Sequence, residues 1–414
     1  MSAKSWFSDD YQEARNRFLD AIEELKELEF EVIQEKLPLN LKGPKGEDLI
    51  IDLAVIGSLE SQNLLLYSSG IHGVEGFAGS AIQLSVLDQI KKQQPFSDYC
   101  IVFIHIINPY GMAWHRRVNE NNVDLNRNFL TNHKGEPEGY KLIDKFINPN
   151  TIPFKFDPFF LIQGLTLLIK HGFTNVKQWF AQGQYTRPKS LQFGGEKIQT
   201  GPELILNWLK LNLRNTQRVF GIDLHTGLGP SGYDTILVPD DINSSDYQTL
   251  IDLFGDHVAA LDPGKSVGYK ITGDIHSGII EQFPSIEWLC ITQEFGTFGP
   301  TKVFKNLRAE NRWTQNNKLK DQNKILNHWS RKNLLNTFNP KDSVWQEKLI
   351  SRGNTVFKIA QDYIKYLVKK YAPKSKIKII EDTFFDHKKI NLSSKKQKRA
   401  FGTKVINGKQ VSDL

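Results

Sequence analysis

Hydrophobic positions near the start of the chain follow a helical spacing and then give way to short, largely apolar runs. Phe18, Ile22 and Leu25 recur three or four residues apart, behind a short run of serine and aspartate. This pattern predicts a capped, amphipathic helix over residues 8–29. Largely apolar runs, which predict strands, lie at 49–56, 63–67 and 100–107. A glycine-rich turn at 70–79 and a further helix separate the last two, a succession typical of an α/β sheet buried on both faces.

The rest of the chain continues the same succession, with one interruption. Further strands are predicted at 219–224, 235–238 and 289–293. Residues 131–200 contain several Gly, Pro and Gln residues and a predicted helix at 159–170, but no strand pattern, so we interpret them as an insertion or lid. A helical pattern returns over 344–370. We therefore predict one α/β domain over residues 1–372, with a mixed, largely parallel sheet and helices on both faces, followed by a tail at 373–414.

Charge is distributed unevenly between these two parts. The chain carries 53 Lys and Arg against 46 Asp and Glu, a net charge of +7. The tail holds 11 basic and 4 acidic residues, so residues 1–372 are formally neutral and the whole excess lies at 373–414. The basic run at 395–399 has few aromatic neighbours, which favours a solvated surface over a nucleic-acid site. The net charge therefore gives no reason to expect nucleic acid as a partner.

Composition narrows the class of protein further. Hydrophobic residues make up 39% and charged residues 24% of the 414 residues, too apolar for a disordered chain and too polar for a membrane bundle. Cys100 and Cys290 lie in apolar runs, which predicts buried, reduced thiols. The N-terminus lacks the apolar segment of a secretory signal, and the longest apolar stretch, 159–169, is shorter than the ~20 residues that span a membrane. We therefore expect a cytoplasmic protein that does not associate with membranes.

Polar residues follow two of the predicted strands, where an open α/β sheet binds its ligands. His72 and Glu75 stand three residues apart in a glycine-flanked turn, and His225 follows the strand at 219–224. His-x-x-Glu is common by chance, and a single histidine at a strand end is more often a structural residue than a ligand. Two histidines and one glutamate together are a ligand set of catalytic zinc, with the fourth position open to water. The combination therefore predicts a metal site.

A third polar cluster, at 115–129, is rich in arginine and asparagine. Arginine binds planar carboxylates with two parallel hydrogen bonds. A solvated charged loop is the simpler interpretation, but the aromatic flanks and repeated asparagines favour a binding role.

These three clusters together resemble the zinc carboxypeptidase (carboxypeptidase A-like) superfamily, and within it an uncharacterised bacterial branch known as a domain of unknown function. The segments that carry the resemblance are HGVEG at 72–76, NPYGMAWHRRVNENNVDLNRNF at 108–129, QYTRP at 184–188, DLHTGLG at 223–229 and TQEFGT at 292–297. They occur in the family's order between roughly residues 8 and 300. The resemblance implies a zinc-carboxypeptidase-like α/β fold.

The resemblance also implies the metal centre. His72, Glu75 and His225 match the family's ligands to one Zn²⁺ per chain. Asp124 matches the carboxylate that orients the first histidine, fixing its tautomer and ring angle.

Substrate-handling residues follow from the same matches. Asn126 and Arg127 match the pair that holds the substrate's terminal carboxylate. Glu294 matches the general base, and its place at the end of an apolar strand suggests a raised pKa. Arg116 and Arg117 compete for the role of stabilising the oxyanion, and we favour Arg117.

Two further residues are less firmly matched. Tyr269 stands where the family has a mobile tyrosine on the substrate side, although an ordinary half-buried tyrosine fits the sequence equally well. His276, in GDIHSG, is interpreted as a structural residue or a substrate contact.

The implied activity is that of a zinc metallocarboxypeptidase, a hydrolase and protease whose partner is a peptide substrate with a free carboxylate. An alternative is an N-acyl amino acid deacylase of the aspartoacylase type, and a second alternative is a non-catalytic binding protein that has kept the pocket. The insertion at 131–200 discriminates between the first two, because a lid that narrows the mouth favours small substrates. The intact ligand set and Glu294 argue against the third.

Overall fold

The computed structural model describes residues 2–239, 242–260, 271–372, 403–406 and 409–412. Contacts within the chain divide it into two compact units, Met1–Lys365 and Tyr366–Leu414. The second unit contains the last turns of helix α13 and an antiparallel hairpin of strands β9 (Thr403–Ile406) and β10 (Lys409–Ser412). All further description concerns the first unit.

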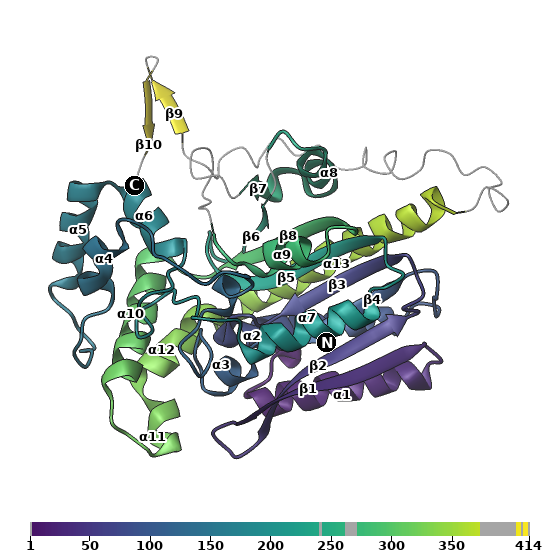
Figure 1. The fold of residues 1–414 in the computed structure, drawn as a ribbon, viewed down its shortest axis with the longest axis horizontal. Coiled ribbons are helices and arrows are strands. Elements are labelled where there is room, and N and C mark those ends of the chain that lie inside the picture. Colours follow the sequence, from purple (N-terminus) through teal and green to yellow (C-terminus); the bar gives the residue numbers. More distant parts are fainter. Residues whose placement is uncertain (1, 240–241, 261–270, 373–402, 407–408, 413–414) are drawn as a thin grey trace. The chain divides into compact units, whose positions relative to one another are not determined.

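The first unit is built on one sheet of eight strands among the described residues, in the order β1-β2-β4-β3-β5-β8-β6-β7 (Figure 1). The strands are β1 (Val32–Lys42), β2 (Asp48–Gly57), β3 (Asn63–Ser69), β4 (Cys100–His105), β5 (Arg218–Gly227), β6 (Asp234–Val238), β7 (Val258–Ala260) and β8 (Glu287–Gly296). The four central strands, β4, β3, β5 and β8, run parallel, whereas β1, β2 and β6 join antiparallel to their inner neighbours. The predicted mixed, largely parallel sheet is confirmed.

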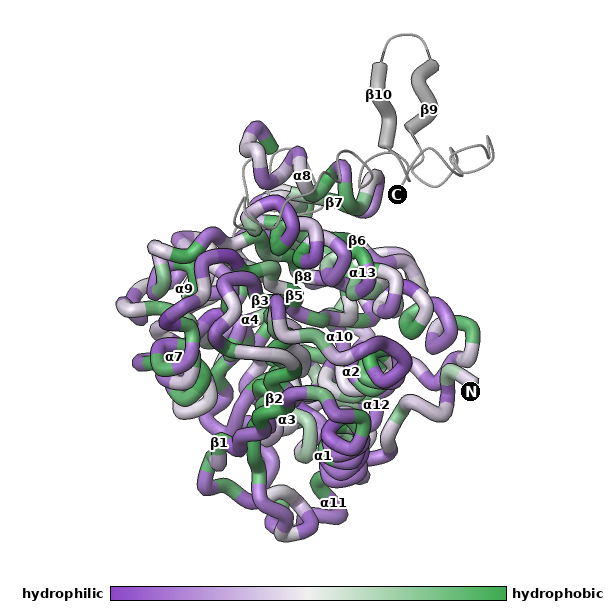
Figure 2. Tube along the Cα trace, turned by 90° about the vertical axis from the view of Figure 1, so that its right-hand side faces the viewer, coloured by the Kyte–Doolittle hydropathy of each residue, from purple (hydrophilic) through white to green (hydrophobic). Residues whose placement is uncertain are grey.

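Helices cover both faces of this sheet, as the predicted apolar strands require. The helices are α1 (Tyr11–Glu27), α2 (Gly76–Ile90), α3 (Pro109–Ala113), α4 (Tyr140–Ile147), α5 (Phe160–His171), α6 (Phe173–Ala181), α7 (Thr200–Asn212), α8 (Ser245–Phe254), α9 (Ile275–Gln282), α10 (Pro300–Asn316), α11 (Gln322–Asn327), α12 (Trp329–Phe338) and α13 (Ser343–Lys370). Helices α7 and α9 lie on one side of the sheet, and α1, α2 and α13 on the other (Figure 2). Every residue of β3, β4 and β5 is buried between these layers.

Two strands continue beyond their predicted ends, and both extensions matter for the site. Strand β8 was expected to end at residue 293 but continues to Gly296, and β5 continues to Gly227. His225 and Glu294 therefore lie within strands rather than after them. Strand β1 was not predicted, because its residues alternate between half-buried and exposed and include Pro38, as suits a sheet edge.

The predicted insertion at 131–200, which we call the lid, contains helices α4, α5 and α6 and no strand of the sheet. Tyr140, Ile143 and Ile147 of α4 form a small apolar core with residues of α6 and with Phe304 of α10. Arg308 of α10 donates to Asp157 at 3.0 Å, a partly buried ion pair that ties the lid to α10. The lid is therefore a helical layer with its own core.

Cys100 and Cys290 are buried and form no disulfide, as predicted. Burial raises the pKa of the Cys100 thiol to about 12. Within the described part of the chain, no helix combines the length and apolar character needed to cross a bilayer.

Candidate functional site

The carboxyl ends of β3, β5 and β8 meet at one edge of the sheet, because these strands are parallel neighbours. His72 follows the end of β3, and His225 lies near the end of β5. In the ladder between β5 and β8, His225 is paired directly with Glu294. Side chains of paired residues in parallel strands point to the same face, so the topology brings these three groups together.

The turn after β3 is held against the loop that follows α3. The amides of Gly73 and Val74 donate to the carbonyls of Arg117 and Arg116 at 3.0 and 2.9 Å. A Cβ on Gly73 would lie 2.0 Å from the carbonyl carbon of Gly111, so only glycine permits this approach. The close packing places His72 and Glu75 beside Arg117, which a bulkier turn would keep apart.

His72, Glu75 and His225 are buried, and one ligand atom from each lies within 4.8 Å of the others. The Nδ1 atoms of His72 and His225 lie 2.9 and 3.2 Å from the two oxygens of Glu75. Nδ1 of His72 is buried, and its contact with Glu75 lacks the geometry of a hydrogen bond, a costly state that a metal ion would relieve. Two imidazole nitrogens and a carboxylate converging on one point fit a zinc site.

A carboxylate stands behind each histidine. Nε2 of His72 lies 3.1 Å from Asp124, and Nε2 of His225 lies 2.6 Å from Asp223. Ser68 donates to the other oxygen of Asp223 at 2.6 Å. Hydrogen bonding of this kind holds each ring with its proton on Nε2 and its lone pair on Nδ1, facing the site. The family resemblance implied this role for Asp124, but not for Asp223. The two-residue spacing between Asp223 and His225 was the available signal, because it puts both side chains on one face of a strand.

Both carboxylates are held in their charged form. Burial by itself would raise the pKa of Asp124, but the charge of Arg117 and the interaction with His72 outweigh burial and hold this pKa well below its usual range. The pKa of Asp223 is also lowered, because its interaction and hydrogen bond with His225 outweigh the effect of burial.

Replacing Asp223 with Asn is expected to weaken zinc binding about 10- to 100-fold, because His225 loses its charged orienting partner. Competition with a chromophoric chelator measures the change. Ser68→Ala, which removes only the support of Asp223, serves as a milder comparison and should weaken binding less. Unchanged affinity in Asp223→Asn would remove Asp223 from the metal centre.

Glu294 is 8% exposed, and its Oε1 accepts a hydrogen bond of 2.8 Å from the amide of Leu228. Burial, with a contribution from the negative charge of Glu75, raises the pKa of Glu294 to about 7. A carboxyl group with a pKa near neutrality can both accept and return a proton. Glu294 also lines the same cavity as the three candidate ligands.

The structure separates the two adjacent arginines. Arg117 lines the cavity and donates to Glu75 at 3.0 Å and to Asp124 at 3.2 Å. Arg116 is buried on the other side of the loop, where it donates to Glu310 at 3.0 Å and to Asn122 at 2.7 Å. The geometry gives Arg116 a structural role, so Arg117 remains as the residue that can face substrate.

The asparagine-rich loop itself is held together internally. Asn122 donates to the carbonyls of Pro188 and Ser190, and Asn128 donates to those of Gly194 and Lys197. We interpreted the repeated asparagines as binding groups, but their side chains fix the loop against the end of the lid.

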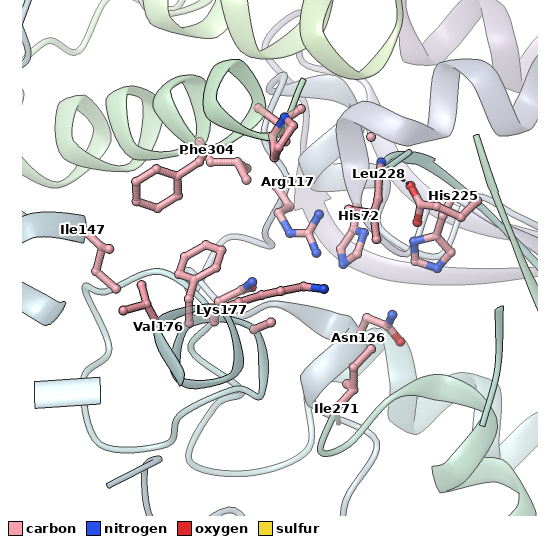
Figure 3. A pocket seen from close by; sticks show the side chains of 18 of the residues that line it. His72, Arg117, Asn126, Ile147, Val176, Lys177, His225, Leu228, Ile271 and Phe304 are labelled. Atoms are coloured by element: carbon pink, nitrogen blue, oxygen red, sulfur yellow. Dashed lines mark hydrogen bonds between the residues drawn. The ribbon is translucent and has the colours of Figure 1, made fainter. Parts of the chain in front are cut away.

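Asn126 and Arg127 both line the cavity. The side-chain oxygen of Asn126 accepts from the amide of Ile275 at 3.0 Å, and its nitrogen is turned toward the side of His72 and His225 (Figure 3). Arg127 is 1% exposed and donates to the carbonyl of Ala181 at 3.0 and 2.6 Å. Arg127 thus anchors the end of α6 beside the site, a contact that the sequence did not indicate.

Two candidate residues remain from the sequence, Tyr269 and His276. Tyr269 lies outside the described residues. His276 is buried in α9 and lines the cavity, and burial lowers the pKa of its imidazole.

The cavity has a volume of about 600 Å³. Lys177 of α6 extends into it near Arg117 and His72 (Figure 3), and burial lowers the pKa of its ammonium group. Much of the remaining wall is made of apolar side chains of the lid and α10. Sequence reasoning missed both features, since neither a lone lysine nor an apolar helix face carries a motif.

The family described as "Protein of unknown function (DUF2817)" matches residues 7–352. No curated protein matches the chain.

Solved structures similar to the chain include thrombin-activatable fibrinolysis inhibitor, at 12% identity and a TM-score of 0.42, covering 86% of this chain and 78% of that one. Carboxypeptidase A from Helicoverpa armigera is 14% identical, with a TM-score of 0.41 and coverage of 84% and 73%. Murein-tripeptide amidase MpaA from Escherichia coli O157 is 16% identical, with a TM-score of 0.32 and coverage of 70% and 93%. Likenesses this distant do not establish an activity.

Proposed function

The chain belongs to the DUF2817 family, and from this premise we propose that it is a zinc-dependent hydrolase that cleaves an amide bond next to a free carboxylate. One observation carries the proposal. The buried set His72, Glu75 and His225 shares a cavity with Glu294, whose pKa of about 7 suits proton transfer. A purely structural metal site would not need a carboxyl group that can exchange a proton beside it.

Nδ1 of His72, Nδ1 of His225 and the carboxylate of Glu75 would hold the zinc ion. A zinc ion bound there supplies Lewis acidity, which polarises a carbonyl group and makes water acidic near neutral pH. Asp124 and Asp223 keep the two imidazoles oriented for this task.

The chain's own residues handle the proton and the charge. In the proposed reaction, a water oxygen bonds to the amide carbon, and the carbon–nitrogen bond then breaks. Glu294 accepts the proton that the water loses and returns it to the leaving nitrogen. Arg117, held in place by Glu75 and Asp124, donates to the oxygen on which negative charge develops.

The free carboxylate would bind among three polar groups of the cavity. These are the amide nitrogen of Asn126, the guanidinium of Arg127 and the ammonium of Lys177. Two cations and a neutral donor in a mostly buried site favour an anionic group and would fix its orientation relative to Glu294.

Peptides and N-acyl amino acids both meet these requirements. A carboxypeptidase reaction is the first candidate, because the resemblance of the sequence motifs implies it. The lid supports the second candidate, deacylation, because α4, α5 and α6 form a wall of the cavity. A covered site accommodates a small amide more readily than the end of a long peptide.

Amides with a free carboxylate are expected to be hydrolysed, and the same compounds with a terminal carboxamide should lose at least about 10²-fold in kcat/KM, because a neutral carboxamide cannot form the charge-assisted hydrogen bonds that a carboxylate forms with cationic side chains. A screen of matched peptides and N-acyl amino acids measures this and separates the two candidates. Lys177→Met should raise KM for the carboxylates only, whereas Lys170→Met, an exposed change on α5, serves as the matched control. Equal rates for carboxylates and carboxamides would contradict the proposal.

A further inference from the structure

The cavity extends well beyond the residues proposed to hold the metal ion and the substrate carboxylate. This further part is lined by apolar side chains. Its wall there is made by helices α4, α5, α6 and α10. The apolar lining residues from these helices include Ile147, Leu161, Leu165, Leu168, Val176 and Phe304. These side chains come from the lid and the helix that packs on it, not from the strand ends that hold the polar groups.

The candidate metal ligands and the apolar side chains of the lid lie at opposite ends of the cavity, and the apolar Leu228 and Ile271 lie at the same end as the histidines (Figure 3). His72 and His225 lie at one end, and Ile147, Val176 and Phe304 at the other, with Arg117 and Lys177 between them. An occupant that satisfies both ends must therefore be an amphiphile. Its polar head would lie at the metal centre and its apolar body under the lid.

The apolar end also reaches the surface of the lid. Leu161, Leu165 and Phe173 line the cavity, yet they are 67%, 59% and 64% exposed. Single exposed hydrophobic residues are ordinary, but a cluster that continues into a cavity marks a binding site for an apolar group. A chain lying in the cavity could thus extend toward this opening.

We propose that the natural substrate carries a long hydrocarbon chain, and that it is an N-acyl amino acid whose acyl chain lies under α4, α5 and α6. This inference rests on the proposed function and specifies its substrate class. The reaction consumes one water: the acyl carbon gains an oxygen, the carbon–nitrogen bond breaks, and the proton passes through Glu294 to the amine. The products are a fatty carboxylate and an amino acid, and no further reactant is needed.

The apolar wall comes from four helices and continues to the exposed side chains of Leu161, Leu165 and Phe173, which argues for a chain rather than a compact side chain. A peptide side chain would fill only the part nearest the metal centre and leave the walls at Ile147 and Phe304 without a partner. Burial of apolar surface contributes about 0.8 kcal/mol per CH₂, which corresponds to about a fourfold gain in kcat/KM for each added CH₂. The gain should continue until the chain reaches the exposed opening.

The test is a series of N-acyl derivatives of one amino acid, from acetyl through hexanoyl and decanoyl to dodecanoyl, assayed with the zinc-loaded protein. Rising kcat/KM with chain length is expected, by about two- to fourfold per CH₂. Leu168→Trp, which places a large ring in the apolar end, should flatten this rise, so that kcat/KM for the dodecanoyl derivative approaches that for the acetyl derivative. Ile169→Trp is the matched control, since Ile169 is 78% exposed on the same helix and does not line the cavity.

Binding of the same series to the Glu294→Gln variant, followed by calorimetry, separates this inference from the proposed function. Affinity that rises with chain length without hydrolysis by the unmodified protein would support the chain site and contradict the hydrolase. Hydrolysis with flat chain-length dependence in both assays would overturn the chain site and leave the hydrolase standing. Preference for peptides with compact apolar side chains over every acyl derivative would also overturn it.

Discussion

The Glu294→Gln variant is expected to keep its zinc and to lose about 10²- to 10⁴-fold in kcat, the usual contribution of a positioned general base. Glutamine preserves the shape of the side chain and can still accept the hydrogen bond from the amide of Leu228. It cannot take a proton from water. The three ligands are untouched, so metal content should remain that of the unmodified protein.

Two controls make this result specific to Glu294. Glu287→Gln changes an exposed glutamate at the start of the same strand, β8, and should leave kcat unchanged. Thermal unfolding of both variants checks that the sheet is intact. Substantial hydrolysis by Glu294→Gln, within about tenfold of the unmodified protein, would exclude Glu294 as the base.

The His225→Ala variant is expected to lose both its zinc and its activity, with kcat/KM falling by at least about 10³-fold. His225 supplies one of the two imidazole nitrogens that face Glu75, and two remaining ligands bind zinc weakly. Elemental analysis after dialysis measures the metal, and hydrolysis of an N-acyl amino acid measures the activity.

His171→Ala is the matched control for His225→Ala, because His171 ends α5 and does not line the cavity. It should retain zinc and activity. Full zinc content in His225→Ala would show that the metal, where bound, is held by other residues.

The candidate metal ligands could be predicted from the sequence because each lies in a short motif beside an apolar strand. Strand order then explains why the motifs meet: β3, β5 and β8 are parallel neighbours. Asp223 lies within the recognised motif DLHTGLG. Its role was not identified because it depends on the side chains of Asp223 and His225 pointing to the same face of β5. The choice between Arg116 and Arg117 needed the structure for the same reason, since adjacent residues point to opposite sides of a loop.

The contribution of the lid to the site was not evident from the sequence. Its central helix α5 could be predicted from helical spacing. Its contribution to the site could not, because the lining of the cavity combines α4, α5 and α6 with α10, more than a hundred residues later in the chain. The anchoring of Ala181 by Arg127 is likewise a contact between distant segments. Such pairings depend on tertiary packing that no local pattern specifies.

Titration of the metal-free protein with zinc, while the hydrolysis of a decanoyl amino acid is followed, shows whether the site works as a zinc hydrolase. We expect activity that rises with added zinc, reaches its plateau at about one equivalent per chain, and disappears again when a chelator is added. Hydrolysis that is indifferent to zinc and chelator, or one bound zinc with no hydrolysis of any carboxylate-bearing amide, would contradict this expectation.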